Sequence, residues 1–238
     1  MSIAQFRFLA ELNNFLNFSR RDTVSNVSFK GRQSIKHLIE AAGVPHTEVG
    51  GIRVNGQPVD FHYLVQDHDQ IEVEPASAST NPSPIEKGFV LDNHLGRLAS
   101  YLRLLGFDVL YQNDYQDEEL AKIATQEERI LLSRDRRLLM RKTILYGYCV
   151  RHLEPRQQLV EVIQRFDLTE QIKPFNRCLH CNHPLEPVAK EAILDRLEPL
   201  TRLYFEEFHI CPACQQIYWK GSHYDHMQAL IHSLQPGE

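Results

Sequence analysis

FVLDNHLGRLASYLRLLGFDVLYQNDYQDEELAKIATQEERILLSRDRRLL occupies residues 89–139, and in it short apolar segments alternate with amphipathic ones. The alternation continues through ILYGYCV and PRQQLVEVIQRF, residues 144–150 and 155–166. Such a pattern is typical of a parallel sheet that helices cover on both faces. We therefore predict a three-layer α/β/α domain over residues 88–172. Ligands of these sheets bind at the carboxyl ends of the strands.

Three aspartates are expected near those strand ends. Asp92 closes the first strand, Asp117 opens the helix after the second, and Asp135 follows the third. Asp is a favoured N-cap, so each aspartate taken alone could serve only to cap a helix. A parallel sheet, however, brings all three to one edge, which capping does not require. We interpret them as the ligands of a catalytic site.

The residue type fits metal-dependent phosphodiester chemistry. Mg²⁺ and Mn²⁺ prefer carboxylate oxygens, and two such ions about 3.5–4 Å apart can stabilise the attacking and leaving oxygens. Without a cation, two carboxylates 4 Å apart repel each other by ~4 kcal/mol at an effective dielectric near 20. Further candidate ligands are Asp114, Glu118 and Glu119. The sequence does not rank these three, because successive helix positions point in different directions.

Residues 76–87, rich in Pro, Ser and Ala, have the composition of a linker. Before them, FRFLAEL and VSFKG suggest a β-hairpin, SIKHLIEAAG a helix that ends at Gly43, and GIRVNGQPV and DQIEVEP further strands. This ββαββ order over residues 1–75 resembles the ubiquitin-like β-grasp, and in particular the sulfur carriers. Those carriers act through a free C-terminal Gly-Gly, which is missing here. We expect a structural or substrate-docking role instead, with a protein or an RNA as a candidate partner.

Two C-x-x-C pairs dominate the last segment, residues 173–238. Cys178 with Cys181 and Cys211 with Cys214 can supply a closed tetrahedral site of four thiolates, which is typical of structural zinc. The long spacing between the pairs predicts a zinc ribbon with an inserted strand or helix. Ligand type alone leaves iron in an S₄ site open. We interpret the fifth cysteine, Cys149, as a buried core thiol.

The middle run carries the motifs D-x-x-L-G-x-L-A-x-x-L-R, G-[FY]-D and [TS]-R-D. In this combination it resembles the Mut-seven-C RNase family, a branch of the PIN-like nucleases, and the resemblance continues through the cysteine pairs. It implies hydrolysis of RNA by metal-activated water, with Asp92, Asp135 and the acidic cluster around Asp117 as catalytic residues. Ser133 stands where the family more often has Thr, and it retains the hydroxyl.

Several residues are candidate contacts to RNA. Arg134 lies beside Asp135, whereas for Arg97 and Arg103 a solvated position on a helix is an equal alternative. The segment from Trp219 to His223 matches a W-x-G-S-H stretch of the family. With Tyr218 before them, Trp219, Lys220 and His223 combine aromatic and cationic side chains that suit stacking on an unpaired base, and packing of the ribbon onto the predicted nuclease domain is an equal alternative.

Composition limits the function classes. The formal charge of −5 argues against a protein that coats nucleic acid electrostatically. No apolar run approaches the roughly 18 residues of a membrane span, and the start lacks a secretory signal, so we expect a cytoplasmic protein. The leading hypothesis is a ribonuclease that acts on RNA, with tRNA and the ribosome as candidate partners. A non-catalytic RNA- or ribosome-associated adaptor is the alternative, and the missing glycines weaken a third hypothesis, a sulfur carrier.

Overall fold

The computed structural model describes residues 1–77 and 84–221. The chain forms two compact units. The first combines Met1–His94 with Gln112–Arg151, and the second combines Leu95–Tyr111 with the described residues from His152 onward. None of the helices in the described part of the chain has the length and apolar character needed to cross a membrane.

The N-terminal sheet of the first unit confirms the predicted β-grasp. Its strands follow the order β2-β1-β5-β3-β4, and the neighbours β1 and β5 are parallel. The helix α1 begins after Ser34, whose Oγ accepts the His37 N–H at 3.3 Å. The elements are β1 (Ser2–Phe8), β2 (Ser25–Phe29), α1 (Ile35–Ala41), β3 (Val49–Val54), β4 (Gln57–Pro58) and β5 (Gln70–Pro75).

Two expectations for this domain need correction. The first strand ends at Phe8, and AELNNF forms the 3₁₀ helix η1 (Ala10–Phe15) because the chain turns at Ala10, which has a φ of 46°. The expected linker also has local structure at its ends. Ala76 is buried, and η4 (Ile85–Lys87) is a 3₁₀ turn.

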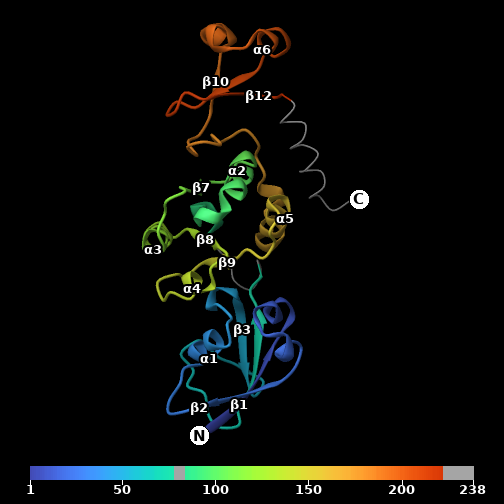
Figure 1. The fold of residues 1–238 in the computed structure, drawn as a ribbon, viewed down its shortest axis with the longest axis vertical. Helices are drawn as coiled ribbons and strands as arrows, with labels where there is room; N and C mark the ends of the chain where they lie inside the picture. Colours follow the sequence, from blue (N-terminus) through green and yellow to red (C-terminus); the bar gives the residue numbers. More distant parts are fainter. Residues whose placement is uncertain (78–83, 222–238) are drawn as a thin grey trace. The chain divides into compact units, whose positions relative to one another are not determined.

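A parallel sheet completes the first unit. It contains β6 (Phe89–Leu91), β8 (Ile130–Ser133) and β9 (Gly147–Cys149), with β8 between the other two. Every residue of these three strands is buried, as expected for strands covered on both faces. The helix α3 (Asp117–Gln126) contacts β6 and β8, and α4 (Arg136–Leu139) contacts β8 and β9 (Figure 1). The predicted parallel sheet is thus confirmed, as is the buried position of Cys149.

The second unit contains α2 (Gly96–Leu104), β7 (Val109–Leu110) and α5 (Pro155–Phe166), with α2 packed against α5. Gly106 follows α2 with a φ of 94°, and a Cβ there would collide with the Lys173 carbonyl oxygen, so the motif G-F-D requires this glycine. An antiparallel sheet of β10 (Glu186–Val188), β11 (Phe208–Ile210) and β12 (Ile217–Trp219) follows. Between the cysteine pairs lie β10, η7 (Lys190–Arg196), α6 (Pro199–Tyr204) and β11, which confirms the predicted insertion.

Candidate active site and metal centre

Asp92 and Asp135 meet at the carboxyl ends of β6 and β8. Leu91 pairs with Leu132, so the residues that follow them, Asp92 and Ser133, lie level with each other. The Ser133 hydroxyl donates to Asp92 Oδ2 at 2.6 Å and accepts from the Asp135 N–H at 2.8 Å. One fully buried hydroxyl therefore joins the Asp92 carboxylate to the backbone N–H of Asp135, at the ends of two adjacent strands.

Helix capping explains only part of this arrangement. Asp135 is the N-cap of α4, and its Oδ1 accepts the Arg137 N–H at 2.7 Å. Asp92 is 6% exposed, and the N-cap of α2 is Leu95. A buried carboxylate is costly unless hydrogen bonds or a cation compensate for its lost hydration. Asp92 does not cap α2; it directly precedes the 3₁₀ turn η5 (Asn93–Leu95), and a cation would compensate its buried charge.

Asp117 is the first residue of α3, and its side chain is half exposed. Arg141 Nη2 lies 3.6 Å from Asp117 Oδ2 and 3.0 Å from Glu118 Oε1. The Arg141 hydrogen bond lowers the pKa of Glu118 below its usual value. Asp114 and Glu119 are exposed. Arg141 thus holds part of the acidic cluster at the start of α3.

The three predicted catalytic aspartates do not form one tight cluster. Among residues 1–77 and 84–221, the only group of three or more metal-ligating side chains whose ligand atoms all lie within 4.8 Å of one another consists of cysteines. The structure therefore links Asp92 through Ser133 to the backbone of Asp135 and leaves Asp117 paired with Arg141.

The candidate RNA-binding arginines differ in exposure. Arg97 and Arg134 are exposed. Arg103 is only 5% exposed, and its Nε and Nη2 donate to the Val109 carbonyl at 3.1 and 2.9 Å. Its Nη1 donates to two carbonyls of the first cysteine loop, at 2.9 and 3.0 Å. These contacts favour a structural role for Arg103 rather than a contact to RNA phosphate.

The four cysteines gather around one point. Their Sγ atoms all lie within 4.8 Å of one another, with Cys178 to Cys214 at 3.5 Å and Cys181 to Cys211 at 3.4 Å. Sulfurs bound tetrahedrally at about 2.3 Å from one zinc ion lie roughly 3.8 Å apart. The cluster therefore has the dimensions of a Cys₄ zinc site.

The pKa values of two of these thiols shift in opposite directions. Burial raises the pKa of Cys178, but hydrogen bonds, led by that of the Tyr218 hydroxyl, outweigh burial and lower this pKa to about 6. For Cys181, burial dominates and raises the pKa to about 12. Four neighbouring thiolates can coexist only if a positive charge offsets their repulsion.

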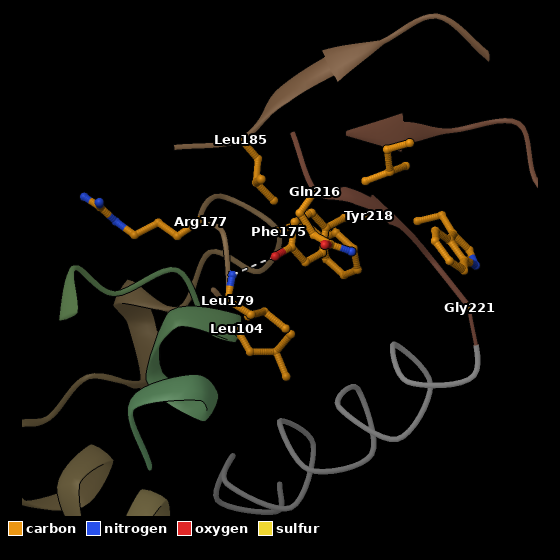
Figure 2. A pocket seen from close by; sticks show the side chains of 10 residues that line it. Leu104, Phe175, Arg177, Leu179, Leu185, Gln216, Tyr218 and Gly221 are labelled. Atoms are coloured by element: carbon orange, nitrogen blue, oxygen red, sulfur yellow. Dashed lines mark hydrogen bonds between the residues drawn. The ribbon is translucent and has the colours of Figure 1, made fainter. Parts of the chain in front are cut away.

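Tyr218 belongs to the scaffold of the cysteine cluster. Its hydroxyl oxygen lies 3.1 Å from Cys178 Sγ and accepts the Leu179 N–H at 3.0 Å (Figure 2). Its side chain also lines a largely apolar pocket of about 290 Å³. The other lining residues are Leu104, Phe175, Arg177, Leu179, Leu185, Gln216, Ile217, Trp219 and Gly221. The contacts of Tyr218 favour packing over base stacking.

Trp219 keeps more exposure than Tyr218, at 36%. Its ring centroid lies 6.4 Å from those of Phe205 and Phe208, so it also packs against the ribbon. His223 lies outside the residues that the structure describes.

Sequence reasoning missed the role of Asp108, the last residue of the motif G-F-D. Its carboxylate lies 3.0 Å from Arg177 Nη2 and accepts from Asn182 Nδ2 at 2.9 Å. The Asn182 amide oxygen in turn accepts the Val109 N–H at 3.0 Å. Asp108 therefore orients the loop of the first cysteine pair. The presence of this aspartate in a motif was the only signal in the sequence.

Comparisons with known proteins cover both parts of the chain. A family model described as the Mut7-C RNAse domain matches residues 87–231, more than half of the chain. A model described as Mut7-C ubiquitin matches residues 1–81. No curated protein and no solved structure matches the chain. The two family matches confirm the resemblance stated from the sequence, in the predicted order.

Proposed function

Because this chain belongs to the Mut7-C RNAse family, we propose that it is a metal-dependent ribonuclease that hydrolyses RNA phosphodiester bonds with Mg²⁺ or Mn²⁺. The observation that carries the proposal is the buried Ser133 hydroxyl, which donates to the Asp92 carboxylate and accepts the backbone N–H of Asp135 at the carboxyl ends of β6 and β8. This is the edge at which parallel α/β sheets bind their ligands.

The residues present fit a hard divalent cation. Mg²⁺ commonly uses one or two protein carboxylates and completes its shell with water and substrate phosphate oxygens. Asp92 and Asp135 supply two carboxylates, and Asp117 is a candidate third ligand if its pairing with Arg141 opens. Asp114, Glu118 and Glu119 remain candidates for contacts through water.

The chemistry divides between the ion and the chain. A bound Mg²⁺ or Mn²⁺ supplies activation of a water molecule and charge stabilisation at the phosphate. Ser133 orients Asp92 by its hydrogen bond, and the α4 N–H group orients Asp135. Arg134, exposed between Ser133 and Asp135, is placed to contact an RNA phosphate.

The proposal assigns RNA as the substrate, with tRNA and the ribosome as candidate partners. Further candidate contacts to the RNA are Arg97, which is exposed, and Trp219, which is partly exposed. The Cys₄ cluster binds structural zinc in this proposal, because a closed site of four thiolates leaves no position for a substrate.

The test is cleavage of labelled single-stranded RNA, hairpin RNA and DNA by the purified full-length chain, with Mn²⁺, with Mg²⁺ and with a chelator. We expect metal-dependent cleavage of RNA. Asp92→Asn and Asp135→Asn should each lower the rate more than about a hundredfold, since loss of outer partners of a metal site alone costs ten- to hundredfold. Asp60→Asn, at a side chain 77% exposed in the N-terminal domain, is the matched control.

Two results would contradict the proposal. RNA left intact under all metal conditions, with RNA binding retained, would support the adaptor instead. Cleavage that persists unchanged in both aspartate variants would place the active site elsewhere.

A further inference from the structure

The N-terminal domain contacts the edge of the nuclease sheet through a buried carboxylate. Glu48 belongs to η3 (His46–Glu48), and its side chain is 3% exposed. Its Oε1 accepts the Cys149 N–H at 2.6 Å, and its Oε2 accepts from Arg151 Nη2 at 2.8 Å. Both oxygens of this buried charge therefore have partners in or next to β9, within the first compact unit.

Two neighbours of Glu48 approach the same region. Nε2 of His46 lies 2.8 Å from the Ile144 carbonyl oxygen. A Cβ added to Gly147 would lie 3.3 Å from the Thr47 methyl carbon, so Thr47 lies close to the backbone of β9. The whole of η3 thus lies against β9 and the segment before it.

A second contact reaches α4. Arg136 Nη1 donates to the Phe15 carbonyl oxygen at 2.9 Å, and the guanidinium carbon lies 4.9 Å from the centre of the Phe15 ring. Arg136 directly follows Asp135, the N-cap of α4. The N-terminal domain therefore holds two of the elements that surround the acidic site.

The position of Cys149 in the sheet links Glu48 to that site. β9 is the last strand of its sheet, and on its inner side Cys149 pairs with Ser133. Val150 N–H donates to the Ser133 carbonyl oxygen at 2.9 Å. An edge strand leaves N–H groups without a partner in the sheet, and Glu48 supplies the acceptor for that of Cys149.

We propose that the ubiquitin-like domain is a built-in positioning module of the nuclease, in which Glu48 fixes the end of β9 and thereby holds Ser133 and the aspartates that it connects. The proposal rests on the proposed function for the role of Asp92 and Asp135. In this proposal the N-terminal domain binds the nuclease domain of the same chain. Glu48 acts as a positioning residue because it acts on the aspartates only through Cys149 and Ser133.

The experiment compares Glu48→Ala, Glu48→Asp and Glu48→Gln in the full-length chain. Ala removes both contacts, Asp is one methylene too short to reach both donors, and Gln keeps an acceptor for the Cys149 N–H. Glu72→Gln is the matched control, because Glu72 pairs with Arg7 at the exposed sheet surface. The measurements are Mn²⁺ affinity, amide hydrogen exchange at residues 131–135 and 149, and the cleavage rate at saturating RNA.

We expect Glu48→Ala and Glu48→Asp to weaken Mn²⁺ binding about tenfold, as typical for partners that orient metal ligands. They should also speed exchange at residues 133–135 and lower kcat more than they change KM. Glu48→Gln should stay within about twofold of the wild type for Mn²⁺ binding, because it restores the hydrogen bond. If Glu48→Ala fails to fold, the proposal is tested by comparing the Mn²⁺ affinity and the amide exchange of Glu48→Asp with those of Glu48→Gln.

Folded Ala or Asp variants with unchanged Mn²⁺ affinity and unchanged exchange at residues 133–135 would overturn the proposal. The amide exchange measurement needs neither metal nor activity. It therefore tests the positioning role of Glu48 separately from the proposed ribonuclease function. Wild-type protein that binds no Mn²⁺ contradicts the nuclease, whereas faster exchange at residues 133–135 in Glu48→Ala would still support the positioning role.

Discussion

Ser133 is the side chain on which the acidic site most directly depends. Its hydroxyl is the hydrogen-bond donor of a buried carboxylate, Asp92. We expect Ser133→Ala to lower the free energy of unfolding by about 1–3 kcal/mol, the usual cost of depriving a buried acceptor of its partner. It should also weaken Mn²⁺ binding. Chemical denaturation and metal titration of the same preparation measure both effects.

Ser133→Thr is the control for this variant, because it restores a hydroxyl at the same position. If Ser133→Thr binds Mn²⁺ as tightly as the wild type and Ser133→Ala binds it more weakly, the weaker binding is due to the loss of the hydroxyl. Equal Mn²⁺ affinity of the wild type and both variants would show that the hydrogen bond does not orient Asp92.

Asp135 combines a capping role with a candidate ligand role, and two substitutions separate them. Asn is as good an N-cap as Asp, whereas Ala costs about 1 kcal/mol at this position. We therefore expect Asp135→Asn to keep the stability of the protein and to lose RNA cleavage, and Asp135→Ala to lose both. Thermal unfolding alongside the cleavage assay distinguishes these outcomes. Full activity in the Asn variant would reduce Asp135 to a cap.

The helix α2 carries two arginines in opposite environments, Arg97 exposed and Arg103 buried. Arg103→Ala removes a guanidinium that donates to Val109 and to the first cysteine loop, so we expect a loss of about 1.5–3 kcal/mol or more in stability. Arg97→Ala should leave the stability within about 0.5 kcal/mol, as typical for surface substitutions. Denaturation curves of the two variants provide the comparison.

The same pair separates folding from RNA binding. Weaker RNA binding in Arg97→Ala at unchanged stability would support a phosphate contact. A stable Arg103→Ala variant would contradict the structural role that its contacts indicate.

The zinc ribbon can be followed by its own fluorophore, since Trp219 in β12 is the single tryptophan of the chain. In Cys178→Ser or after strong chelation we expect loss of one equivalent of zinc. The Trp219 emission should shift to longer wavelength, because structural zinc sites contribute directly to folding. Metal analysis and fluorescence give the two readouts. Unchanged zinc content in Cys178→Ser would remove the Cys₄ assignment.

The elements of the fold were predictable to different degrees. The continuous apolar runs of β6 and β8 predicted buried parallel strands, and the two C-x-x-C pairs predicted the ribbon. The 3₁₀ helix η1 was not predicted, because its positive φ at Ala10 has no signal in residue type.

The candidate site was predicted in its residue types but not in its connections. The carboxyl-end rule placed Asp92 and Asp135 together, whereas the hydroxyl connection depends on the register of β6 against β8, which sequence does not contain. Glu48 lies about a hundred residues from Cys149 in sequence. Its contact depends on how the N-terminal domain meets β9, and neither its residue type nor its surroundings indicated it.

Across the whole molecule, three distant segments contribute to one site. β6 supplies Asp92, the β8–α4 junction supplies Ser133 and Asp135, and the N-terminal domain holds β9 through Glu48. The family matches assign these segments to a ribonuclease domain and to a ubiquitin-like domain of the same family. The proposed cleavage of RNA depends on one central claim, that this site binds a divalent ion.

Anomalous diffraction from crystals of the full-length chain soaked in Mn²⁺ tests that claim most directly. We expect a manganese peak within bonding distance of carboxylate oxygens of Asp92 and Asp135, and its loss in crystals of Asp92→Asn. Well-ordered crystals with no peak at these aspartates at millimolar Mn²⁺, or with a peak that persists in Asp92→Asn, would contradict the account.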